Sequence, residues 1–153
     1  MAQRIGVISD THGLLRESAR QRLSLCDLII HAGDSGSRSV LTELEEVAEV
    51  VAVRGNVDRG TWASELKDIA YVDVEGTRIC VVHDRNRLSD AAISRAGVVI
   101  YGHSHQPHIE WTGGVLYLNP GSAGPRRFGL PVSMALLHVE AAGPRPDLIE
   151  LPL

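Results

Sequence analysis

The first half of the chain alternates short apolar runs with segments in which apolar residues recur at helical spacing. Residues 4–9, 27–31 and 49–54 are apolar runs rich in Val and Ile, and each has the length of a buried strand. Residues 14–25 and 38–47 lie between these runs and have the pattern of helices. The order strand, helix, strand, helix, strand predicts a parallel sheet with right-handed crossover helices.

Hairpins dominate the second half of the chain. The pattern predicts hairpins at 70–83, 108–119 and 132–153, a helix at 88–96 and a strand at 97–102. A parallel unit followed by antiparallel hairpins indicates two packed sheets with helices on the outside. Because the sequence contains no linker, internal repeat or low-complexity segment, we expect a single domain over the whole chain, 1–153.

Composition narrows the class of protein. The chain has 153 residues, 44% hydrophobic and 22% charged, which is ordinary for a globular protein. A net charge of -4 and a lone lysine, Lys67, argue against a nucleic-acid-binding face.

Cys26 and Cys80 are expected to be reduced thiols. With no apolar stretch of about 20 residues and no signal-peptide pattern, we expect a soluble cytoplasmic protein with no membrane partner. The oligomeric state stays open, a homo-oligomer included.

Polar residues capable of chemistry follow five of the predicted strands. These stretches are SDTHG after 4–9, AGD after 27–31, GNVD after 49–54, HD after 78–82 and GHSH after 97–101. Open α/β folds bind their ligands at the carboxyl ends of the strands. We therefore expect these side chains to meet at one edge of a sheet.

The spacing of these residues indicates a metal site. Asp10 and His12 are two residues apart, as are His103 and His105, so each pair can point to one side of an extended chain. Carboxylates and imidazoles together are ligands for Mn²⁺, Fe²⁺ or Zn²⁺. Taken singly, DTH could cap the following helix and GD could be turn chemistry. Two histidines after a glycine have few purely structural uses, so the combination predicts a metal site.

The ordered set DTH, GD, GN-x-D, H and GHSH resembles the calcineurin-like metallophosphoesterase superfamily. The segment LNPGSAGPRR is similar to its small branch of bacterial and archaeal phosphodiesterases, which includes the Vps29 fold. The resemblance covers nearly the whole chain, from Ile5 to the last hairpin. It implies an α/β fold, namely a four-layer α/β/β/α sandwich with two mixed β-sheets flanked by helices and a metal site at the strand ends.

The resemblance also implies two adjacent divalent metal ions, Mn²⁺ by preference and otherwise Fe, Zn or Ni. Carried over by position, the first ion is held by Asp10, His12 and His105, the second by Asn56, His83 and His103, and Asp34 bridges both. The implied reaction is hydrolysis of a small phosphate ester, a diester rather than a monoester, by a hydroxide held between the metals. Asp34, Asn56 and His103 are the ligands assigned to catalysis.

Residues around these ligands have two explanations each. Asp58 either orients a ligand or its loop, or caps a turn. Arg126 and Arg127 either clamp a substrate phosphate or form a solvated pair. His31 is expected in the core or against a ligand loop.

Two positions depart from the family pattern. Val57 stands where many larger members have a histidine that protonates the leaving group, which restricts the expected reaction to good leaving groups. Asp84 stands where a glycine is usual, and its carboxylate beside the second metal would either strengthen metal binding or repel a phosphate. These departures leave a second hypothesis, a non-catalytic Vps29-like protein-interaction scaffold. A nuclease is disfavoured by the acidic net charge and the lack of a basic groove.

Overall fold

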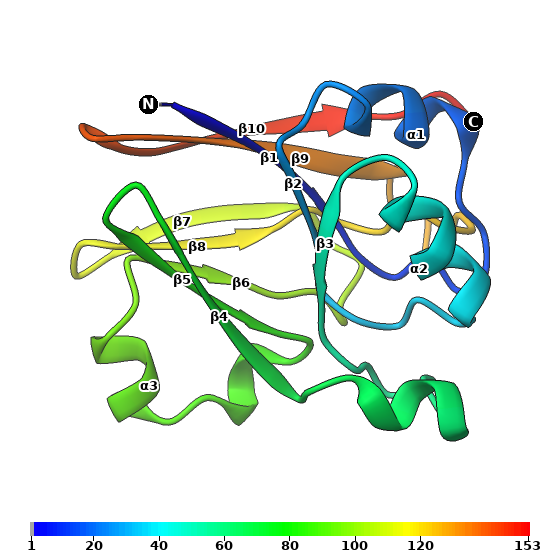
Figure 1. Ribbon diagram of the computed structural model, residues 1–153, viewed down its shortest axis with the longest axis horizontal. Coiled ribbons are helices and arrows are strands. Elements are labelled where there is room, and N and C mark those ends of the chain that lie inside the picture. The colour runs from blue at the N-terminus through cyan, green and yellow to red at the C-terminus, as the bar shows by residue number, and fades with distance from the viewer. Residues whose placement is uncertain (1) are drawn as a thin grey trace.

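The computed structural model describes residues 2–153, which form two five-stranded mixed sheets packed face to face (Figure 1). The first sheet has the order β10 (Gly143–Glu150), β9 (Ser133–Glu140), β1 (Gln3–Ile8), β2 (Leu28–His31) and β3 (Glu49–Ala52). The second has the order β4 (Ile69–Val74), β5 (Thr77–Val82), β6 (Val98–Ile100), β8 (Val115–Asn119) and β7 (His108–Thr112). In each sheet three neighbouring strands are parallel, β1–β2–β3 and β5–β6–β8, and the others are antiparallel.

The helices lie on the outer faces of the two sheets. In Figure 1, α1 (Glu17–Leu23) and α2 (Arg38–Glu45) lie on the side of the first sheet, and α3 (Asp90–Ser94) lies on the side of the second. Separate apolar clusters fill the space between the sheets, the space under α1 and α2, and the space under α3. The predicted four-layer α/β/β/α sandwich is confirmed.

Strands β1 and β2 are apolar on both sides because both of their faces are covered. Ile5 and Val7 belong to the cluster between the sheets, whereas Ile8 belongs to the cluster under α1 and α2. Ile30 and Ile29 divide between the same two clusters in β2. This two-sided burial explains why the sequence shows continuous apolar runs here rather than alternation.

The first helix differs from its predicted position. It begins at Glu17 rather than at residue 14, and its N-cap is Arg16, whose side chain makes no capping bond. The backbone at His12 and Gly13 is left-handed, with φ of 47° and 84°, so the helix cannot start there. DTH is therefore not a helix cap, which removes its non-metal explanation.

Two short 3₁₀ helices were not predicted, η1 (Thr61–Glu65) and η2 (Arg85–Arg87). Each is no longer than five residues, too short to produce a helical period in the sequence. Within residues 2–153, no helix is both long and apolar enough to span a membrane. Cys26 and Cys80 are free thiols, as expected.

Candidate metal centre

Two aspartates at the exits of β1 and β2 each bond to the protein through one carboxylate oxygen. Asp10 Oδ2 accepts hydrogen bonds from Ser9 Oγ at 2.6 Å and from the backbone N–H of His103 at 3.2 Å. Asp34 Oδ1 accepts one from the backbone N–H of Val57 at 2.9 Å. The oxygens left for a ligand are therefore Asp10 Oδ1 and Asp34 Oδ2.

Three imidazoles surround these two free oxygens. Asp10 Oδ1 lies 3.4 Å from His105 Nε2, and 3.8 Å from the Nε2 atoms of both His12 and His83. Asp34 Oδ2 lies 3.1 Å from His83 Nε2 and 3.9 Å from His12 Nε2. The structure thus brings together five of the seven predicted ligands, from four strand exits.

The polar atoms of this cluster fit a divalent cation. His83 Nδ1 lies 2.8 Å from the carbonyl of Ala32, and donating its proton there leaves the Nε2 lone pair facing the carboxylates. Among the described residues, the buried atoms Asp10 Oδ1, His83 Nε2 and His105 Nδ1 have no hydrogen-bond partner. An unsatisfied buried polar atom costs about 1–3 kcal/mol, and a metal ion would satisfy the first two of these atoms directly.

Backbone strain coincides with the predicted ligands. Left-handed φ angles, between 47° and 75°, occur at five of the predicted ligands, namely Asp10, His12, Asp34, His103 and His105. Within residues 2–153, only Glu75 and Phe128 share this conformation among the non-glycine residues. It costs on the order of 1–2 kcal/mol at a residue with a Cβ. Such strain is typical of functional sites, where the surrounding structure holds side chains in one direction.

The charges in the cluster act on one another. Burial raises the pKa of Asp34, but the adjacent imidazole of His83 and the hydrogen bond from the Val57 N–H outweigh it and lower the pKa to about 2. Burial lowers the pKa of His83, yet the adjacent carboxylates of Asp34 and Asp10 raise it above 6.5 overall. Asp34 is therefore an anion over the whole range in which a metal would bind.

The remaining two predicted ligands border the cluster. The ring of His103 lies edge-on to that of His83, with centroids 5.2 Å apart, and its side chain is exposed. Asn56 is exposed and lines a cleft together with His83.

Two sets of side chains are close enough to hold a metal ion, and Asp10 belongs to both of them, whereas Asp34 belongs to one. The two groups whose donor atoms all lie within 4.8 Å of one another are Asp10, His12 and His105, and Asp10, Asp34 and His83. Asp34 Oδ2 still lies within 4 Å of one histidine from each predicted set, His12 and His83. Either carboxylate is thus placed to bridge two ions.

Asp58 fixes the loop that carries Asp34. It is buried, and its Oδ2 accepts hydrogen bonds from the backbone N–H groups of Asp34 at 3.0 Å and Gly55 at 2.9 Å. Its Oδ1 accepts one from the N–H of Gly36 at 2.9 Å. These bonds join the exits of β2 and β3, which favours the loop-orienting explanation over a local turn cap.

The other predicted neighbours differ in their relation to the centre. Burial lowers the pKa of His12, the negative charge of Asp34 opposes this shift, and the positive charge of Arg127 adds to it. Arg126 is exposed, and no contact places it at the ligands. Asp84 Oδ1 accepts a hydrogen bond from the Asn86 backbone N–H at 3.0 Å and caps η2.

A buried chain of hydrogen bonds behind the ligands was only partly anticipated. His31 Nδ1 accepts from the Gly33 N–H at 3.1 Å, so its Nε2 carries the proton and bonds Thr11 Oγ1 at 2.9 Å. Thr11 Oγ1 in turn donates to the Ser35 carbonyl at 3.0 Å. Ser122 Oγ donates to the Asp10 carbonyl at 2.9 Å. Ser9, Thr11 and Ser35 are common residue types at strand ends, so no pattern in the sequence set them apart.

Comparison with known proteins gives the class. The chain matches the calcineurin-like phosphoesterase superfamily domain over residues 3–142, and it belongs to that superfamily. A probable metallophosphoesterase from Methanothermobacter thermautotrophicus is 36% identical over 145 residues, which cover 86% of this chain and 84% of the relative. The resemblance inferred from the strand-exit motifs is confirmed, and membership supports phosphoesterase activity and binding of divalent metal.

Solved structures agree with this class. An archaeal phosphodiesterase superposes with a TM-score of 0.80 at 27% identity, covering 95% of this chain and 99% of that one. Vps29 from Cryptosporidium parvum superposes with a TM-score of 0.78 at 16% identity, covering 97% of each chain, and shows that the fold is shared.

Proposed function

We propose that the protein is a dinuclear metal-dependent phosphoesterase that hydrolyses small phosphate esters, diesters in preference to monoesters. The observation that carries this proposal is the convergence of Asp10, Asp34 and three histidines, in which the buried atoms Asp10 Oδ1 and His83 Nε2 have no hydrogen-bond partner among the described residues. Asp10, His12 and His105 would hold one ion, Asn56, His83 and His103 the other, and Asp34 would bridge them. Mn²⁺ is the ion we expect, with Fe, Zn and Ni as alternatives.

The protein's own groups would act around these ions. Divalent metals supply an activated water at neutral pH and neutralise charge on a reacting phosphate. We assign catalysis to three of the ligands. Asp34 lies between His12 and His83, whereas Asn56 and His103 are exposed to solvent at the border of the cluster. Arg127, whose charge reaches His12, would hold a substrate oxygen, and Arg126 would assist it.

The leaving group would depart without help from position 57. The Val57 side chain is 48% exposed and cannot donate a proton, while its backbone N–H is bonded to Asp34. We therefore expect aryl esters, whose leaving groups need no proton, to react well and alkyl esters to react poorly. The diester preference draws on the similarity to the archaeal phosphodiesterase.

The test begins with protein stripped of metal by a chelator and reloaded with Mn²⁺, Ni²⁺, Zn²⁺ or Mg²⁺ separately. Metal content is measured alongside hydrolysis of aryl phosphodiesters and monoesters. We expect two ions per chain, metal-dependent turnover and faster diester hydrolysis. Asp34→Ala should lose both turnover and at least one ion.

Other outcomes would assign the protein differently. Stoichiometric metal uptake without turnover on any ester would contradict the enzyme proposal and favour the Vps29-like scaffold. One ion per chain would contradict the dinuclear site. The single domain, the cytoplasmic location and any homo-oligomer remain predictions, and sedimentation of the metal-loaded chain measures the last of these.

A further inference from the structure

A cleft of about 640 Å³ opens beside the metal centre, on the side of Asn56 and His83. Its walls come from the loop after β3, the segment before β4 and the turn after β5. Three arginines, Arg54, Arg59 and Arg87, line it. The cleft is continuous with two predicted metal ligands, so a substrate bound at the metals can extend into it.

The three arginines have different partners. Arg54 is held by Asp68, with Nε and Nη2 donating to Oδ1 at 3.1 and 2.8 Å. No carboxylate in residues 2–153 lies within ion-pair distance of Arg59 or Arg87, and both side chains are exposed. These two guanidinium groups therefore keep their hydrogen-bond donors and their charge for a ligand.

Asp84 and Arg87 both line this cleft, and Asp84 caps the turn that carries Arg87. Its carboxylate caps η2 by accepting from the Asn86 N–H, and η2 consists of residues 85–87. Arg85 turns to the outer face of the second sheet, where it packs on the Tyr117 ring at 4.1 Å and reaches Glu110 at 3.4 Å. Asp84 thus caps a turn whose two arginines divide between the sheet surface and the cleft.

The charge of the cleft favours an anion. Arg54 and Asp68 neutralise each other, and Asp84 offsets one of the two remaining arginines, which leaves one net positive charge in a chain whose overall charge is -4. Guanidinium forks match the oxygens of phosphate, and they bind it with charge-assisted hydrogen bonds.

We propose that Arg59 and Arg87 bind a second phosphate group of the substrate, one that is not hydrolysed, while the reacting phosphate lies at the metals. This inference rests on the proposed function and names its substrate class, phosphate esters that carry a further phosphate.

The test uses phosphonates, which the enzyme cannot hydrolyse. Binding of alkyl monophosphonates and of the matching α,ω-bisphosphonates, from ethane to hexane, is measured by calorimetry on metal-loaded protein. At one chain length we expect the bisphosphonate to bind about tenfold more tightly than the monophosphonate. Arg59→Gln and Arg87→Gln should each reduce that ratio, and the double variant should abolish it.

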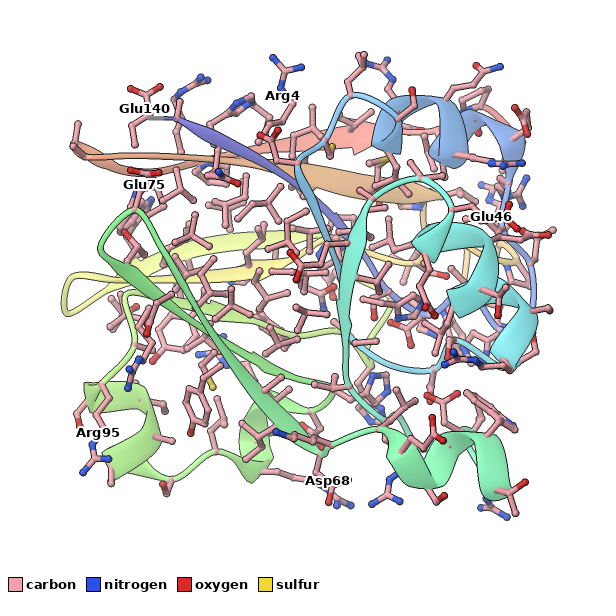
Figure 2. The ribbon with its side chains drawn as sticks, viewed as in Figure 1. Arg4, Glu46, Asp68, Glu75, Arg95 and Glu140 are labelled. Atoms are coloured by element: carbon pink, nitrogen blue, oxygen red, sulfur yellow. The ribbon has the colours of Figure 1, made fainter. Side chains whose placement is uncertain are left out.

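Arg95→Gln is the matched control. Arg95 is also exposed, but it lies at the end of α3, and Figure 2 shows it well apart from Asp68, one of the residues that line the cleft. This variant should keep the bisphosphonate advantage. Metal analysis after each titration checks that the bisphosphonate has not removed the ions.

The outcomes separate this inference from the proposed function. If monophosphonates bind only when metal is present but no bisphosphonate binds better, the second phosphate site is refuted and the phosphoesterase stands. If the advantage persists in the double variant, Arg59 and Arg87 are not its source. If monophosphonates do not bind the metal-loaded protein at all, the proposed function itself fails.

Discussion

Val57 has no acidic or basic side chain, yet its backbone orients one of the predicted metal ligands. Its backbone N–H holds Asp34 Oδ1 at 2.9 Å, which leaves Oδ2 for the histidines, while its side chain is 48% exposed at the edge of the centre. Any residue other than proline supplies that N–H. The side chain is thus free to decide which leaving groups are accepted.

Val57→His should therefore extend the reaction to alkyl esters. A histidine at an exposed position beside the reacting phosphate can donate a proton to an alkoxide, which contributes about 10²–10⁴-fold, whereas a nitrophenolate needs none. Rates for alkyl and nitrophenyl diesters are compared in the wild type, in Val57→His and in Val57→Asn, the non-titrating control. Equal acceleration of both esters would show that position 57 does not control leaving-group departure.

Asp58 acts on the metal without touching it. Asp58→Asn keeps the shape but replaces one of two acceptor oxygens with a donor, so at least one N–H of Asp34, Gly55 or Gly36 loses its partner. We expect the free energy of unfolding of the metal-free protein to fall by about 1–3 kcal/mol. Metal affinity should fall about 10–100-fold.

Urea unfolding in chelator and metal titration measure the two effects of Asp58→Asn separately. The control is Asp73→Asn, which removes an exposed partner of Arg78 and should change both quantities little. Unchanged metal affinity in Asp58→Asn would show that the Asp34 loop holds its geometry without this carboxylate.

At the scale of elements, the strand exits were predictable and the turns around them were not. Apolar runs and polar exits placed Asp10, Asp34 and His83 on strand ends, and the structure brings these residues together. The late start of α1 and the two 3₁₀ helices escaped prediction because they follow from left-handed backbone and from caps, which leave no period in the sequence. Hydrogen bonds donated by backbone N–H groups, such as that from Val57 to Asp34, cannot be predicted from the sequence either, because every residue except proline has this group.

Strand β6 offers a paired test of how closely the elements pack at the centre. A Cβ on Gly102, at its carboxyl end, would collide with Ser9 Oγ and lie 2.7 Å from Asp10 Oδ2. A Cβ on Gly97, at its amino end, would meet only the Thr77 methyl at 3.2 Å and the Arg78 carbonyl at 3.7 Å. Both glycines flank the same short strand, so the two substitutions differ chiefly in their distance from the ligands.

Gly102→Ala should displace Ser9 and Asp10, lowering the free energy of unfolding by about 1–3 kcal/mol and weakening metal binding at least tenfold. Gly97→Ala should stay within about 1 kcal/mol of the wild type, since a small shift of Thr77 is offset by the loss of glycine's freedom in the unfolded chain. Thermal unfolding and metal titration of both variants provide the comparison. Equal metal affinity in the two would show that Asp10 does not depend on the Ser9 contact.

For the whole molecule, pH should act on stability through a buried histidine that no substrate reaches. Burial lowers the pKa of His31 to about 4, although the charges of Asp10 and Asp58 oppose the shift. Its neutral form is required, because Nδ1 accepts from the Gly33 N–H. In the unfolded chain the pKa is near 6.5, so as pH falls below 6.5 the unfolded state takes up a proton that the folded state refuses.

The contribution of His31 to the free energy of unfolding of the metal-free protein should accordingly fall by about 3 kcal/mol between pH 6.5 and pH 4. His83 acts in the opposite sense, because its raised pKa adds stability in acid that is lost as pH rises through that pKa. Comparison with His31→Gln isolates the first effect, since both proteins contain His83. Urea unfolding in chelator at each pH should show the stability difference between wild type and variant shrinking by about 3 kcal/mol on acidification. A difference that stays constant with pH would mean that His31 titrates alike in both states, and that the hydrogen bonds joining the β1 and β2 exits do not depend on its neutral form.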